Sequence, residues 1–109
     1  MNELATKKCK PCEGGVAAFG EAQARDMLKA LLGWSLEDGK LVKLYPFANY
    51  HHTMAFVNAL AWISHREDHH PDLEVGYNKC RVTYWTHAVG GLSENDFICA
   101  AKCDALFEL

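Results

Sequence analysis

Histidines dominate the part of this sequence that could do chemistry. The chain has 109 residues and six histidines, three of which fall in the run His65-Arg66-Glu67-Asp68-His69-His70-Pro71. A fourth, His87, follows Thr86 further along the chain. An imidazole has a reference pKa of about 6.5, so it gives or takes a proton near neutral pH. Several imidazoles around one cleft would suit a reaction that protonates a leaving group and removes a proton elsewhere.

A zinc site is the main alternative for the same residues. His65 and His69 are four residues apart, and a third histidine could complete a ligand set. However, Glu67 is the third residue of this run, whereas the two zinc-protease motifs, H-E-x-x-H and H-x-x-E-H, place the glutamate second or fourth. The His65-Arg66-Glu67 sequence matches the H-x-E of zinc deaminases, but no P-C-x-x-C follows it. The spacing therefore favours proton transfer.

The five cysteines raise a second metal or redox alternative. Cys9 and Cys12 form a C-x-x-C, and Cys99 and Cys103 are four residues apart. Four thiolates could hold zinc, but C-x-x-x-C is not the spacing of a zinc ribbon. An odd number of cysteines argues against a disulfide framework and for a reducing compartment. We therefore favour a structural or incidental role for the cysteines.

Composition places the chain among ordinary globular proteins. Half of the residues are hydrophobic, 23% are charged, and the net charge is −3. The sequence lacks the excess of basic residues that a nucleic-acid-binding protein usually shows. No apolar stretch reaches the roughly 20 residues of a membrane span, and the N-terminal residues lack the apolar region of a secretory signal. We therefore expect a cytoplasmic protein with neither a nucleic-acid nor a membrane partner.

Helical and strand-like periodicities alternate along the chain. The start, residues 1–16, contains proline and glycine and is expected to be a flexible arm before a single domain over residues 17–109. Asp38-Gly39 predicts a tight β-hairpin turn. The spacing of apolar residues predicts a helix over 19–32, strands over 34–37 and 40–45, a helix over 49–68, strands over 73–77 and 79–87, and a helix after Ser93.

This order predicts an α+β fold, helix-strand-strand-helix-strand-strand-helix, with a four-stranded antiparallel sheet and helices packed on one face. The middle helix, residues 49–68, is apolar nearly all round and needs cover on more than one side. We therefore expect self-association as a dimer or tetramer. Trp34, Trp62 and Trp85 are expected in the core.

The predicted elements would bring the functional side chains to one place. His69 and His70 leave the end of the middle helix, because the Pro71 ring disfavours further helix there. His87 is expected at the end of a strand, and the ends of elements are where functional residues converge. Asp96 in Ser93-Glu94-Asn95-Asp96 is expected to cap the last helix, and it could also place a charge near His87.

The spacing of these residues resembles the signature of the pterin-4a-carbinolamine dehydratase family. Five residues separate Pro71 from Tyr77, nine separate Tyr77 from His87, and eight separate His87 from Asp96. The resemblance covers about Phe19 to Leu106. It implies loss of water from 4a-hydroxytetrahydropterin to give quinonoid dihydropterin, without a metal or organic cofactor.

The resemblance also implies partners. The reaction would recycle the tetrahydropterin cofactor of aromatic amino-acid hydroxylases, phenylalanine hydroxylase in particular. Subunits of the family pair through sheet edges and through their middle helices. An alternative function is a dimerisation or coactivator-type binding module on the apolar middle helix, since mammalian members stabilise the dimer of a homeodomain transcription factor. A zinc protein remains a third hypothesis.

The resemblance assigns roles to residues by position. His69 and His87 would protonate the departing 4a-hydroxyl, and His70 would position the ligand or act as a base. His65 stands where many members carry a glutamate, and with Asp96 it is expected to support the site. Glu67 lies about 200° around the helix from His65 and is a poor substitute. Contacts to the pterin are expected from Asp68, His69, His70, Trp85, Thr86, His87 and Ala88.

Overall fold

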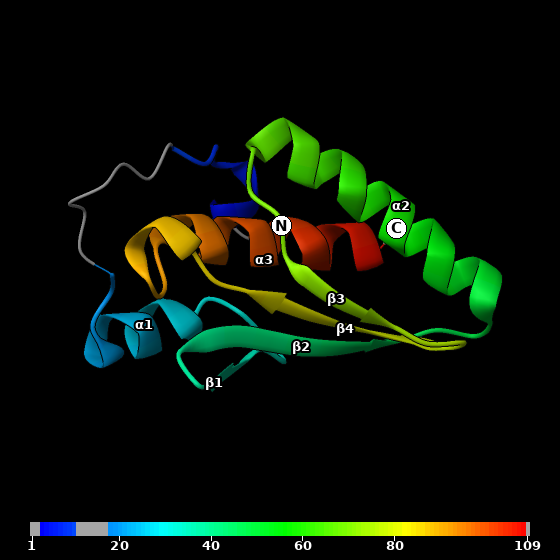
Figure 1. The fold of residues 1–109 in the computed structure, drawn as a ribbon, viewed down its shortest axis with the longest axis horizontal. Coiled ribbons are helices and arrows are strands. Elements are labelled where there is room, and N and C mark those ends of the chain that lie inside the picture. The colour runs from blue at the N-terminus through cyan, green and yellow to red at the C-terminus, as the bar shows by residue number, and fades with distance from the viewer. Residues whose placement is uncertain (1–2, 11–17, 109) are drawn as a thin grey trace.

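The computed structural model describes residues 3–10 and 18–108 (Figure 1). The predicted order of three helices and four strands is confirmed, and two short 3₁₀-helices, η1 and η2, accompany them. The elements are η1 Glu3–Thr6, α1 Glu21–Leu28, β1 Ser35–Glu37, β2 Lys40–Pro46, α2 Tyr50–Glu67, β3 Asp72–Val75, β4 Lys79–Tyr84, η2 His87–Val89 and α3 Glu94–Phe107.

The four strands form one antiparallel sheet in the order β1-β2-β4-β3. Leu41 and Tyr45 of β2 stand opposite Tyr84 and Cys80 of β4, and all four side chains are fully buried. Because alternate residues of a strand share a face, this register collects the core on one side of the sheet. Figure 1 shows α2 and α3 lying over that side, with α1 beside the end of the β1–β2 hairpin.

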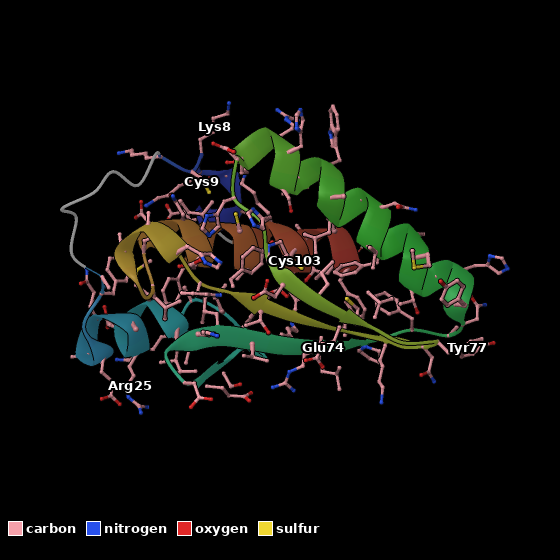
Figure 2. All side chains as sticks on the ribbon, in the orientation of Figure 1. Lys8, Cys9, Arg25, Glu74, Tyr77 and Cys103 are labelled. Carbon is pink, nitrogen blue, oxygen red and sulfur yellow. The ribbon has the colours of Figure 1, made fainter. Side chains whose placement is uncertain are left out.

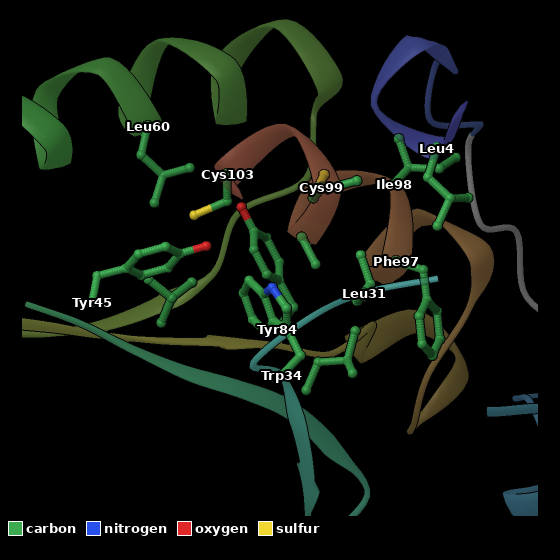
Figure 3. Packing of buried hydrophobic residues seen from close by; sticks show 14 of the residues in the cluster. Leu4, Leu31, Trp34, Tyr45, Leu60, Tyr84, Phe97, Ile98, Cys99 and Cys103 are labelled. Atoms are coloured by element: carbon green, nitrogen blue, oxygen red, sulfur yellow. The ribbon is translucent and has the colours of Figure 1, made fainter. Parts of the chain in front are cut away.

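A carboxylate on α3 ties the last helix to the sheet. Asp104 accepts hydrogen bonds from the indole Nε1 of Trp34 at 3.1 Å and from Nζ of Lys43 at 2.8 Å. The Tyr45 hydroxyl donates to the same carboxylate. Figure 3 shows Trp34 and Tyr45 among the buried side chains that this network anchors. Three donors from β2 and the segment before β1 thus meet one acceptor.

The middle helix α2 begins and ends at signals present in the sequence. The Asn49 side chain accepts a hydrogen bond from the backbone N–H of His52 at 3.0 Å, which caps the first turn.

The prediction that Trp62 belongs to the core is wrong, because its residue surface is 63% exposed on the outer side of α2. The sheet and α3 cover one side of this apolar helix and leave the other open. No helix in the described part of the chain is long and apolar enough to cross a membrane.

Two predicted elements end three or more residues earlier than expected. Helix α1 stops at Leu28 rather than at residue 32, and the chain then turns at Gly33 with φ 82°. Strand β4 stops at Tyr84, so His87 begins η2 instead of ending a strand. The strand ends early because Thr86 pairs with Gly91 across a tight loop that Gly90 closes at φ 65°.

Residues 3–10, expected within a flexible arm over 1–16, pack against α3. Leu4 is buried in the core, and Nζ of Lys102 donates a hydrogen bond to the carbonyl oxygen of Ala5 at 2.8 Å. The partner of this segment lies at the other end of the chain, so no local pattern could predict the contact. Residues 11–17, which include Cys12, lie outside the described residues.

Candidate active site

The chain leaves α2 through a left-handed turn that separates two histidines. Asp68 has φ 50° and ψ 42°, and its backbone N–H bonds to the carbonyl oxygen of His65. This turn swings His69 off the helix, so His69 does not stack above His65 on a helical face. The His65 ring stays exposed beside Trp62, with 6.0 Å between their ring centroids.

His69 turns inward and meets a buried carboxylate. Its Nε2 lies 2.6 Å from Oδ1 of Asp96, whose side chain has no exposed surface. An ionised carboxylate accepts hydrogen bonds and donates none, so Nε2 carries the hydrogen and Nδ1 is the remaining ring nitrogen. The imidazole also stacks on Tyr84, with 6.0 Å between centroids and 7° between planes. Two neighbours therefore fix the orientation of His69.

Asp96 performs the predicted capping role at the same time. Its Oδ2 accepts hydrogen bonds from the backbone N–H of Ser93 at 3.0 Å and from Oγ1 of Thr86 at 2.7 Å. The Ser93 side chain accepts from the backbone at the third position of α3, which completes a capping box. The N-terminus of a helix favours negative charge. The histidine that Asp96 meets is His69, rather than His87 as one interpretation of the sequence had it.

His70 lies in the loop after α2, and it faces His87 of η2. Their ring centroids are 6.4 Å apart, with 22° between the ring planes. The ring centroids of Trp85 and His87 are 3.8 Å apart, and Nζ of Lys40 lies 4.7 Å from the centroid of the Trp85 ring. The planes of the indole and the imidazole are 38° apart, and the two rings together offer an aromatic surface that suits a heterocyclic ligand.

A cleft with a volume of about 430 Å³ is lined by these three histidines and Trp85. This volume lies within the range of small-molecule sites. A larger hollow of about 670 Å³ lies between α1 and the β1–β2 turn, but no histidine lines it. The cleft is lined by Cys9, Lys10, Arg66, Glu67, Asp68, His69, His70, Trp85, Thr86, His87, Ala88 and Asn95.

The structure brings together most of the residues that the sequence singled out. Asp96 lies behind the cleft as the hydrogen-bond partner of His69, and His65 lies outside it. His65 therefore does not orient His69. The predicted residues that line the cleft are Asp68, His69, His70, Trp85, Thr86, His87 and Ala88.

Five further residues line the cleft without having been predicted. Glu67 and Asn95 are adjacent in sequence to predicted residues, and that adjacency is the signal that could have found them. Oε1 of Glu67 accepts a hydrogen bond from the backbone N–H of Cys9 at 2.8 Å, not from a histidine. Cys9 and Lys10 line the cleft only because the N-terminal segment packs there in the tertiary structure. The five are Cys9, Lys10, Arg66, Glu67 and Asn95.

The metal-site alternatives have no ligand cluster in the described ranges. Within residues 3–10 and 18–108, no three His, Cys, Asp or Glu side chains are grouped so as to hold a metal ion. Cys9 and Cys99 approach each other, whereas Cys103 is directed toward Tyr45. Cys12 lies outside the described residues.

The fold and the cleft define a class of protein: a small α+β domain in which three histidines surround a cleft and a buried aspartate fixes one of them. The family model described as Pterin 4 alpha carbinolamine dehydratase matches residues 17–106. This chain belongs to the pterin-4a-carbinolamine dehydratase family, as its spacing indicated.

Relatives and solved structures agree with this assignment. The chain is 62% identical over 105 residues to a protein of Nitrosomonas eutropha, covering 95% of this chain and 93% of the relative. It is 58% identical over 109 residues to one of Nitrosospira multiformis, covering 100% and 96%. The names of both assign them provisionally as pterin-4-alpha-carbinolamine dehydratases.

Two solved structures share the fold. A transcriptional coactivator/pterin dehydratase from Brucella melitensis superposes with a TM-score of 0.79 at 28% identity, covering 82% of this chain and 97% of that one. A pterin dehydratase-like protein described as a RuBisCO assembly factor of the alpha-carboxysome superposes with a TM-score of 0.56 at 30% identity, covering 67% and 84%.

Proposed function

We propose that this protein dehydrates 4a-hydroxytetrahydropterin to quinonoid dihydropterin by histidine acid–base catalysis. The observation that carries the proposal is the fixed imidazole of His69, held 2.6 Å from buried Asp96 in a cleft that also contains His70 and His87. Membership of the dehydratase family supports the substrate class.

The reaction requires two proton movements. The bond between C4a and the hydroxyl oxygen breaks, and the oxygen leaves as water after taking a proton from an acid. The N5 proton passes to a base while the N5 electron pair forms the N5=C4a double bond. Hydroxide is a poor leaving group, so positioned acids and bases contribute about 10²–10⁴-fold each.

The geometry supports a division of roles among the imidazoles. His69 and His87 act as the acids that protonate the 4a-hydroxyl, and His70 positions the pterin or accepts a proton. Asp96 is a positioning residue, because it fixes the tautomer and orientation of His69. The ring pair of Trp85 and His87 supplies an aromatic surface for the pterin. The dehydration itself requires no metal or organic cofactor.

The reaction would regenerate a tetrahydropterin cofactor. The substrate is the product that aromatic amino-acid hydroxylases release, so we place the protein beside such an enzyme, phenylalanine hydroxylase in particular. We place this activity in the cytoplasm, where a reducing environment suits the four described cysteines, all of which are free thiols.

The test follows the absorbance of a 4a-carbinolamine with and without protein. Wild type should accelerate its disappearance, and His69→Ala and His87→Ala should each lose about 10²-fold or more. His51→Ala and His52→Ala are matched controls, because both histidines are exposed in the first turn of α2. Unchanged rates in both active-site variants would contradict the assignment of acids.

A second proposed role is protein binding through α2. Trp62 and Tyr50 are 63% and 51% exposed on α2, a helix that is apolar nearly all round and needs cover on more than one side. We infer that this surface serves self-association, as a dimer or tetramer, and it is also where an outside helix would bind. A pull-down that recovers this chain and no other protein would contradict a coactivator-type role.

A further inference from the structure

The N-terminal segment forms one wall of the cleft and is held there by side chains on two helices. At the end of α2, Glu67 accepts the backbone N–H of Cys9 at 2.8 Å. At the start of α3, Oδ1 of Asn95 accepts the backbone N–H of Lys10 at 3.0 Å, and Nδ2 of Asn95 donates to the Lys10 carbonyl oxygen at 2.6 Å. Figure 2 shows Cys9 beside the C-terminal end of α2.

The same segment places two thiols in contact. Sγ of Cys9 lies 3.5 Å from Sγ of Cys99, a residue 90 positions away in the sequence. Cys99 is fully buried on α3, near Leu4 and Ile98 in the core (Figure 3). Cys9 is half-buried and lines the cleft, so small solutes can reach it from that side.

We propose that Cys9 and Cys99 form a reversible disulfide that fastens the N-terminal wall of the cleft to α3. A disulfide bond is about 2.05 Å long, so the two sulfur atoms need to approach by only about 1.5 Å. Hydrogen bonds to Glu67 and Asn95 already hold the backbone of Cys9 and Lys10, and Cys99 lies within α3, so the bond requires side-chain rotation rather than refolding.

The oxidation balances with a peroxide as the two-electron oxidant. The Cys9 thiolate attacks one peroxide oxygen and the O–O bond breaks, so that Cys9 becomes a sulfenic acid. The other oxygen leaves as hydroxide and takes up the proton that the Cys9 thiol released, which forms the first water. The Cys99 sulfur then attacks Sγ of Cys9, the S–O bond breaks, and the oxygen leaves as water with the proton that Cys99 releases. The net change is two thiols and one hydrogen peroxide to one disulfide and two waters. A dithiol reductant reverses it.

The order of the two steps follows from the surroundings of each thiol. The hydrogen bond with Cys9 and burial in the core both raise the pKa of the Cys99 thiol above its ordinary value. Cys99 therefore stays protonated and is shielded, whereas Cys9 faces the cleft. Cys103, one helical turn beyond Cys99, is buried and directed toward Tyr45, so it does not compete.

The experiment treats the full chain with hydrogen peroxide and identifies linked peptides by mass spectrometry, with thermal unfolding measured in parallel. Wild type should lose the mass of two hydrogen atoms, yield a peptide pair joining Cys9 to Cys99, and unfold at a higher temperature, since closing a long loop restricts the unfolded chain. A dithiol reductant should reverse all three changes.

Three variants make the result decisive. Cys12→Ser should behave as wild type, because the proposal does not use Cys12, and Cys9→Ser should form no link to Cys99. Cys99→Ala tests the second sulfur without placing a hydroxyl in the core. A Cys9–Cys12 link, or sulfinic acid on Cys9 without any link, would overturn the proposal. A Cys9–Cys99 link in protein without dehydratase activity would support the disulfide while contradicting the proposed function.

Discussion

Asp96 Oδ1 lies 2.6 Å from Nε2 of His69, although 27 positions of sequence and three elements, β3, β4 and η2, separate the two residues. The aspartate is fully buried at the first turn of α3, and the histidine is only 11% exposed at the exit of α2. One carboxylate therefore caps a helix with one oxygen and orients a cleft imidazole with the other. Asp96 therefore contributes both to the stability of α3 and to the chemistry proposed for the cleft.

Replacing Asp96 with asparagine should separate its two roles. The amide oxygen can still accept the Ser93 N–H, so the cap persists and the protein folds. The amide nitrogen cannot accept from His69, so the tautomer that Asp96 fixes is lost. We expect kcat to fall about 10²-fold with little change in KM, and the pH profile of kcat to shift.

Glu94→Gln is the matched control for that experiment. It also removes a carboxylate from the first turn of α3, but Glu94 faces Lys7 at 3.4 Å and touches no cleft histidine. Its kcat and KM should match wild type. Equal losses in Glu94→Gln and Asp96→Asn would show that helix charge, not the contact with His69, sustains activity.

His65 should have little effect on catalysis despite its place in the family spacing. Its ring is exposed beside Trp62 and outside the cleft, so His65→Ala should keep kcat/KM within about twofold of wild type. His70→Ala, five positions along and inside the cleft, should lose far more. Steady-state kinetics of the two variants check the contrast, and a large loss in His65→Ala would contradict the geometry.

The oligomer should depend on the outer face of α2. A charge at Trp62 would have to be desolvated in any contact through that face, so Trp62→Glu should lower the mass measured by analytical ultracentrifugation. Leu32→Glu serves as the control, because Leu32 is 86% exposed and lies outside α2. A wild-type sedimentation profile for Trp62→Glu would exclude this face as the interface.

Asp104 should matter for stability and not for the cleft. Asp104→Asn weakens the acceptor shared by Trp34, Lys43 and Tyr45, and should lower the free energy of unfolding by about 1–3 kcal/mol. Asp26→Asn, whose side chain is 79% exposed, should change it by less than about 0.5 kcal/mol. Urea unfolding measures both, and equal effects would contradict the network.

Alkaline pH should destabilise the fold. Burial raises the pKa of Cys103 from 9.0 to about 12, and burial also raises the pKa of Cys80 and of the Tyr84 phenol. In the unfolded chain the two thiols lose their protons above about pH 9 and the phenol above about pH 10, while the folded chain keeps them. The free energy of unfolding therefore falls as pH rises, up to the folded pKa.

Each such group contributes about 1.4 kcal/mol per pH unit over that interval. Urea unfolding between pH 8 and pH 11 should therefore show a steadily falling free energy of unfolding. Cys103→Ala should reduce the slope, whatever its own stability at pH 8. A free energy that stays level across this range would contradict the assignment of these groups as buried and protonated.

Much of the fold was decided by local patterns in the sequence. The alternation of strands about Asp38-Gly39, the cap at Asn49 and the Ser93-to-Asp96 box each act within a few residues, so their signals are readable without the fold. The spacing from His69 to Asp96 likewise identified the family and most of the cleft. Local hydrogen bonding and periodicity suffice for features of this kind.

The tertiary structure alone decided which of these residues meet. A left-handed turn at Asp68 separates His69 from His65 and lets His69 contact Asp96. Helix periodicity cannot predict such a turn. The contact of Cys9 with Cys99 joins positions 90 residues apart, and it arises because the N-terminal segment packs on α3. Long-range packing sets such pairs, since they depend on where whole elements lie rather than on their own sequences.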